Sequence, residues 1–219
     1  MSRSPVVALI AKDVYLYRWM TLGSLVAGLA ALPLLGAGGT LSILGMILFV
    51  TVMGVHSAIV AAHGPLSERQ THTLALVLSL PVSPLQAAMA RIAASLVSYS
   101  IPWGVLFLVL VSLQLALPAE QSNLPYTVGL MVFLLANFCV LLAMVMIGRS
   151  ELWCIAGLIG SNTAVPVFMN SVLLTLAPWI EGEKSWSPAL LLTLAGLLAT
   201  ALLALSAIVF VHSRRRDFL

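Results

Sequence analysis

The chain has 219 residues, of which 61% are hydrophobic and 8% charged, and its formal net charge is +3. Soluble domains carry about 25% charged residues, so a chain this poor in charge cannot cover a water-facing surface. Its basic residues lie in short loops and at the two ends rather than along one face, which excludes nucleic acid as an expected partner. The composition therefore indicates an integral membrane protein.

Uninterrupted apolar runs, without the alternation of a β-barrel, predict an all-α polytopic membrane protein. In lipid the backbone must satisfy its own hydrogen bonds, and about 20 apolar residues in a helix cross the hydrocarbon core. Six segments meet this criterion, and together they form a single transmembrane domain over residues 1–219. The predicted spans are 21–36, 41–62, 92–117, 126–147, 153–176 and 188–211.

The first twenty residues predict an amphipathic helix that lies on the membrane. Val6, Ile10 and Val14 recur at helical spacing, charged residues surround them, and Trp19 stands at interface depth. We therefore expect an interfacial helix over 1–20 before the first span. In the fifth span the pattern after Pro166 leaves two possibilities, a continuous helix or a re-entrant pair of short helices over 166–187.

The distribution of Lys and Arg predicts the orientation, because short cytoplasmic loops accumulate positive charge. With six spans, nine of the ten basic residues fall on one side and only Lys184 falls on the other. The nine are Arg3, Lys12, Arg18, Arg69, Arg91, Arg149, Arg214, Arg215 and Arg216. We therefore expect both termini in the cytoplasm and a multi-pass protein of a bacterial-type cytoplasmic (inner) membrane.

No Asp, Glu, Lys or Arg lies within the predicted spans, which argues against a secondary transporter with a proton-binding carboxylate. We expect no catalytic residue and no metal site. A membrane protease would need a nucleophile and a base, and His56 with Ser161 is the one pair to weigh. The residues around Ser161 lack the Gly-x-Ser-Gly pattern of rhomboid proteases, so we interpret His56 as structural.

Other polar or reactive side chains in the spans have structural interpretations. Gln114, Asn137, Asn162 and Asn170 are expected to hydrogen-bond between helices. The two cysteines, Cys139 and Cys154, fall in apolar runs and should behave as small hydrophobic residues.

The polar segment 63–86 between the second and third spans carries the most informative pattern. Ser67 could cap a short helix, on which Leu74, Val77 and Leu78 would share one face, and Pro81 would end it. The pattern predicts a short amphipathic helix presented to the cytoplasm. The alternative is an interfacial helix that only closes the loop.

This loop resembles the first cytoplasmic loop of ABC-2 type permeases, which typically has a Glu, then Thr-Leu, then Ser-Leu-Pro-Val-Ser. Here those elements are Glu68, Thr73-Leu74 and Ser79 to Ser83, while His72 stands where the family usually has Gly. The amphipathic N-terminal segment, the six spans and the basic tail are also similar. The resemblance implies an ABC-2 (type V exporter-like) transmembrane domain, the permease half of an exporter. The implied ATPase-coupling residues are Glu68, Arg69, Thr73, Leu74, Val77, Leu78 and Pro81.

The chain contains no Gly-x-x-x-x-Gly-Lys-[Ser/Thr] motif, so we do not expect it to hydrolyse ATP itself. The resemblance implies two copies of a separate ABC ATPase, which would bind ATP and Mg, and a second permease copy within the membrane lipid. A homodimer is expected because two-fold symmetry is the commonest closed arrangement, with a heterodimer left open. Alternatives are a haem-export permease of cytochrome maturation, another transport or channel-like assembly, and a membrane scaffold. The substrate stays open.

The charge distribution makes a topology prediction. Reporter domains fused after Gly38, Gln121 and Gly182 should be found outside, and those fused after Gln70, Ser150 and Leu219 should be found in the cytoplasm. Compartment-specific activity of paired reporters measures each position. A reporter after Gln70 on the outer side would overturn the six-span orientation.

Overall fold

The computed structural model describes residues 5–71, 84–117, 123–148, 150–173 and 186–214, and in these ranges its regular elements are helices only. They are α1 (Pro5–Gly36), α2 (Gly39–Thr71), α4 (Pro84–Ala116), α5 (Leu124–Ile147), α6 (Glu151–Val167), the π-helix η1 (Phe168–Leu173) and α8 (Pro188–Arg214). Six of the described helices are long and apolar enough to cross a membrane, with α6 and η1 together forming the fifth. The prediction of an all-helical chain with six candidate spans is confirmed.

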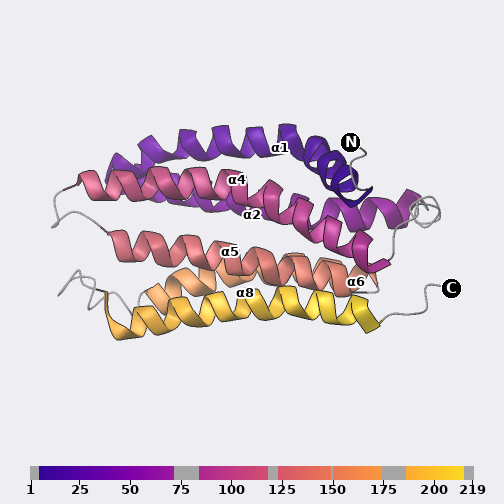
Figure 1. Ribbon diagram of the computed structural model, residues 1–219. Helices are drawn as coiled ribbons and strands as arrows, with labels where there is room; N and C mark the ends of the chain where they lie inside the picture. Colours follow the sequence, from indigo (N-terminus) through magenta and orange to yellow (C-terminus); the bar gives the residue numbers. More distant parts are fainter. Residues whose placement is uncertain (1–4, 72–83, 118–122, 149, 174–185, 215–219) are drawn as a thin grey trace.

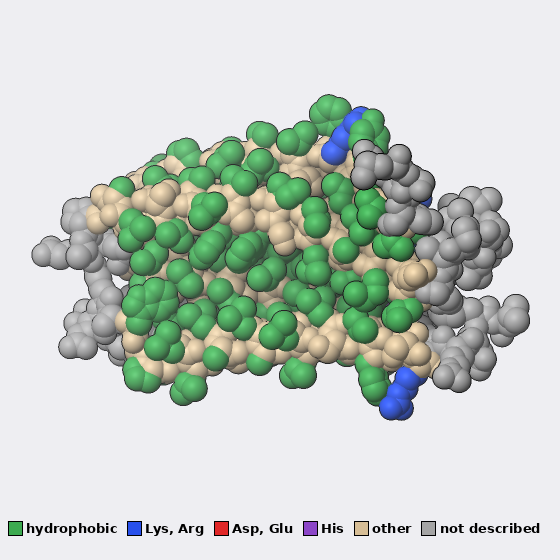
Figure 2. All heavy atoms as spheres, viewed as in Figure 1, with side chains coloured by type: hydrophobic (Ala, Val, Ile, Leu, Met, Phe, Trp, Pro, Cys, Tyr) green, Lys and Arg blue, Asp and Glu red, His purple; other side chains and the backbone are tan. Residues whose placement is uncertain are grey.

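The helices run along one axis in two layers (Figure 1). One layer holds α1, α2 and α4, and the other holds α5, α6 and α8. Helix α5 is the centre of the bundle, since it packs on α2, α4, α6 and α8. In its most apolar stretch 67% of the residues are buried inside the chain, against 11% for α8. Apolar side chains cover the visible outer face, as expected for a surface in contact with lipid (Figure 2).

The N-terminal end of α1 and the C-terminal end of α8 lie at the same end of the bundle (Figure 1). The described basic side chains of Lys12, Arg18, Arg91 and Arg214 belong to the helix segments nearest that end, and those visible in Figure 2 are there. The guanidinium of Arg18 lies 3.7 Å from the ring centroid of Tyr15. Aromatic and basic side chains thus mark this end as an interface between membrane and water.

Helix α1 joins the predicted interfacial helix and the first predicted span without a break between them. Its first turns run at an angle to the rest of the helix (Figure 1). About 18 residues, roughly 27 Å of helix, follow Arg18 up to Gly36, which suffices to cross the hydrocarbon core. The charged first part can therefore lie at the interface while the helix stays continuous.

Two predicted boundaries around the polar segment 63–86 differ from the structure. Helix α2 continues to Thr71, well past Ala62, and α4 already begins at Pro84. The expected helix cap at Ser67 is therefore wrong, because Ser67 lies inside α2 rather than before a new helix. The predicted bounds followed hydropathy, which marks only the apolar residues, whereas the helices themselves continue into the polar residues.

The chain stays helical beyond Pro166, as the π-helix η1. Proline has no backbone N–H to donate to the carbonyl four residues earlier, and its ring crowds that carbonyl, so a wider turn relieves the helix. For residues 166–187 either a continuous helix or a re-entrant pair of short helices was predicted. The structure shows a continuous helix as far as Leu173, and residues 174–185 lie outside the described ranges.

A tight turn joins α1 to α2 at the opposite end of the bundle. Gly38 and Gly39 have φ values of 73° and 56°, in the left-handed region that favours glycine. Gly45 lets the two helices approach closely, because a Cβ there would lie 2.7 Å from the backbone nitrogen of Leu35. The hydroxyl of Ser42 donates a hydrogen bond to the Leu35 carbonyl over 3.0 Å. The first two helices are thereby fixed as a hairpin.

Candidate functional site

The predicted coupling residues fall mostly outside the described part of the chain. Glu68 and Arg69 belong to the last turn of α2 as backbone, while their side chains are not described. Thr73, Leu74, Val77, Leu78 and Pro81 lie in residues 72–83, outside the described ranges. The structure does show that α2 continues without a break about 14 Å beyond Ala62, to Thr71.

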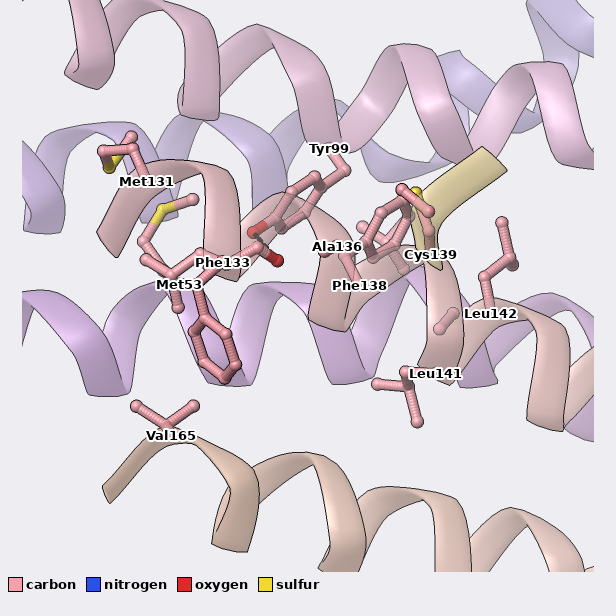
Figure 3. Packing of buried hydrophobic residues seen from close by; sticks show 14 of the residues in the cluster. Met53, Tyr99, Met131, Phe133, Ala136, Phe138, Cys139, Leu141, Leu142 and Val165 are labelled. Carbon is pink, nitrogen blue, oxygen red and sulfur yellow. Dashed lines mark hydrogen bonds between the residues drawn. The ribbon is translucent and has the colours of Figure 1, made fainter. Parts of the chain in front are cut away.

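Near its middle, α2 meets α4 and α5 at an aromatic cluster. Tyr99 of α4 stacks on Phe138 of α5, with ring centroids 4.0 Å apart and planes at 10°. The ring of His56 of α2 lies nearly parallel to the ring of Tyr99, with centroids 5.9 Å apart and planes at 15°. Figure 3 shows Tyr99 pointing from α4 toward the α5 side chains. These three fully buried rings join three helices.

His56 is held by the backbone of α4. Its Nε2 atom lies 3.2 Å from the carbonyl oxygen of Ser98, so this nitrogen carries the proton and donates it. Its Nδ1 atom is buried, and within the described residues neither it nor the Ser98 hydroxyl has a hydrogen-bond partner. The imidazole is buried and hydrogen-bonded, as the structural interpretation of His56 expects.

Two aromatic side chains of α4, one turn apart, donate hydrogen bonds to carbonyls of α5. The Tyr99 hydroxyl donates to Leu134 over 3.2 Å, and the Trp103 indole donates to Met131 over 2.8 Å. Both carbonyls lie inside a helix, where a second lone pair of the oxygen is free to accept. These contacts were not predicted from the sequence, although the spacing of four residues on an apolar helix indicates that Tyr99 and Trp103 share a face.

Asn137 of α5 makes the expected link between helices. Its amide donates to the hydroxyl of Ser161 in α6 over 2.8 Å, with the Ser161 carbonyl 3.3 Å away. The protease pairing of His56 with Ser161 finds no support, because the two residues have these different partners. Gln114 accepts a hydrogen bond from the backbone of Asn123 just before α5. Asn170 was predicted to bond between helices, but it donates to Pro166 within its own turn.

Exposed polar side chains lie at membrane depth on α6 and on the following η1. Asn162, Thr163 and Asn170 are exposed, and Thr51 is exposed on the adjacent helix α2. A Cβ at Gly54 of α2 would lie 3.6 Å from the Asn162 side-chain oxygen, which places the two helices side by side here. Asn162 was predicted to hydrogen-bond between helices, but within the described residues its amide has no hydrogen-bond partner. An exposed, unpaired amide is unfavourable in lipid, so this side of α2 and α6 requires contact with water or protein.

The described ranges contain no cluster of three or more metal-ligating side chains. Cys139 and Cys154 are free and buried, as their apolar surroundings predicted.

Searches against protein-family models, curated proteins and solved structures find no match to this chain.

The contact between Asn137 and Ser161 gives a quantitative prediction. A double-mutant cycle of Asn137→Ala and Ser161→Ala should show a coupling energy of about 0.6–2 kcal/mol, because interhelical hydrogen bonds in membranes have this range. Unfolding in mixed micelles containing a denaturing detergent measures it. Thr163→Ala is the matched control. Its hydroxyl bonds only to Ile159 in its own helix, so it should be additive with Asn137→Ala.

Proposed function

We propose that the chain is the membrane-spanning permease subunit of an ABC transporter of the ABC-2 type, an exporter half driven by a separate ATPase. The observation that carries the proposal is the loop sequence with Glu68, Thr73-Leu74 and Ser79 to Ser83 between the second and third apolar helices. The absence of a phosphate-binding motif from the sequence supports an external source of energy.

The continuity of α2 supports a mechanism for coupling. ATP binding would close the paired ATPases and displace the segment between α2 and α4. A helix without a break transmits a displacement at its end along its length, and α2 runs unbroken from Gly39 to Thr71. The displacement would reach His56, where α2 meets Tyr99 and Phe138, and also the hairpin contact at Gly45. ATP hydrolysis would then reset the bundle.

The polar outward side of α2 and α6 supports pairing of two permease copies. A second copy facing Asn162 and Thr51 would remove these side chains from lipid and enclose a pathway between the two chains. No Asp, Glu, Lys or Arg lies on α6 between Glu151 and Val167 or on η1. A lipid-like, peptide-like or amphipathic molecule fits such a pathway better than a bare ion.

The decisive experiment is reconstitution with and without an ATPase. The purified chain alone should hydrolyse no ATP, and activity should appear only with a separately encoded ATPase that copurifies with it. Phosphate release in nanodiscs measures this. Robust hydrolysis by the lone chain, in a preparation free of contaminating ATPase, would contradict the proposal.

Variants in the loop test its role in docking. Leu78→Asp should abolish or strongly weaken ATPase binding, because an unpaired carboxylate would be forced into an apolar contact. Glu68→Ala should weaken the binding free energy of the ATPase by about 2–5 kcal/mol if the partner charge of Glu68 stays buried, and by much less if the pair is exposed. Copurification of the ATPase and ATP-dependent transport are the two measurements.

Ser79→Asp is the matched control for Leu78→Asp, because it adds the same charge to the neighbouring, polar position. It should bind the ATPase nearly as well as the unmodified chain. Insertion into the membrane should survive all three changes, since none lies in the apolar part of a span. Wild-type transport by both Leu78→Asp and Glu68→Ala would leave the loop as a mere closure of the membrane interface.

A further inference from the structure

A cavity of about 740 Å³ lies between the helices, at the end of the bundle opposite the N-terminal end of α1 and the C-terminal end of α8. Its walls are the last turns of α1, the first turns of α2, the last turns of α4 and the first turns of α5. Ligand pockets in proteins typically have about 300–1,000 Å³. The cavity therefore has room for a small organic molecule or a lipid chain.

The walls change in character along the helix axis. The polar side chains in the lining gather near the helix ends, and they are Ser42, Gln114, Asn123, Tyr126 and Thr127. Further in, the walls are apolar and include Leu29, Phe49, Leu110 and Met131. Along α2 the lining extends from Ser42 to Phe49, about 10 Å of helix. No charged residue belongs to the lining.

Two side chains at the polar end can donate hydrogen bonds to a ligand. The Gln114 side-chain oxygen already accepts from the backbone nitrogen of Asn123 over 2.8 Å, which fixes the orientation of its amide. The amide NH₂ group then keeps its two donors, and within the described ranges it has no partner. The Tyr126 hydroxyl likewise has no partner among the described residues. By contrast, Ser42 and Thr127 donate to nearby backbone carbonyls.

Water is a poor occupant of the inner part. An ordered water needs about 2–4 polar partners, and the side chains of Leu29, Phe49 and Leu110 supply none. A hydrocarbon chain there would make the dispersion contacts with the apolar walls that an empty space lacks. The close contacts of α1 lie outside the cavity, at Gly28 against Leu106 and at Gly45 against Leu34, so α1 cannot settle inward and fill it.

We propose that this cavity binds an uncharged amphiphile of the monoacylglycerol type, with its hydrocarbon chain along the apolar walls and its hydroxyl or ester head group at Gln114 and Tyr126. The lack of charged lining residues argues against a head group that carries a net charge. The proposal does not depend on an ATPase partner. The same chemistry would suit a resident membrane lipid or a transported molecule.

The test uses the full chain in nanodiscs of zwitterionic phospholipid and a palmitoyl monoacylglycerol with a photoactivatable diazirine near the end of its chain. Labelled peptides should come from α1 and α5, around Leu29 and Leu130. Met46→Trp replaces a flexible thioether in the lining by a bulky ring and should lower the labelling about tenfold, equivalent to about 1.4 kcal/mol of binding free energy. Leu48→Trp is the matched control, since Leu48 is exposed on the same helix outside the lining, and its labelling should be unchanged.

A second arm tests the head group. Gln114→Leu should weaken labelling by the monoacylglycerol but not by a diazirine alkane of equal chain length, because only the former uses the amide. If Met46→Trp does not fold, as judged by its thermal transition, the smaller change Met46→Phe takes its place. Unchanged labelling in the folded Met46 variant, or labelling spread evenly over lipid-facing helices such as α8, would overturn the proposal.

Mass spectrometry of the chain as purified separates the two sources of the ligand. A monoacyl lipid already bound indicates a resident lipid, while labelling only after the probe is added indicates a molecule that exchanges. Either result requires the same cavity, so the Met46 variant decides in both cases.

Discussion

Hydrogen bonds from α4 to the backbone of α5 join the two layers of this bundle. In lipid the hydrophobic effect does not drive helices together, so association relies on packing and polar contacts. Tyr99 and Trp103 supply both, because each ring packs in the core and each polar tip reaches a carbonyl of α5. Phe138 then stacks on Tyr99, while Phe133 stacks on Phe168 of η1 with centroids 4.0 Å apart. Aromatic contacts thus join α5 to α4 and to η1.

The number of spans was predictable because apolar length alone determines it. The predicted spans 126–147 and 188–211 lie close to the described helices Leu124–Ile147 and Pro188–Arg214. The helix ends near 62 and 92 were not predictable in the same way. Hydropathy measures preference for lipid, whereas a helix continues into water wherever its residues tolerate it, as α2 does up to Thr71.

The polar contacts were predictable only in part. An Asn in an apolar run must find a partner, and this rule correctly gave Asn137 a neighbour on another helix. The identity of the neighbour depends on which helices lie side by side, and no local pattern contains that information. Asn170 shows the other limit, since a side chain can also satisfy its amide within its own turn. The coupling residues rest on sequence resemblance, and most of their side chains lie outside the described ranges.

The inner and outer polar groups of the bundle differ in a way that bears on assembly. Inside, Tyr99, Trp103 and Asn137 all have partners, whereas the buried Nδ1 atom of His56 and hydroxyl of Ser98 have none among the described residues. Outside, Asn162 is exposed at the depth where lipid chains would surround a lone chain. An amide exposed to lipid is unfavourable, so a surface that covers Asn162 would stabilise the bundle.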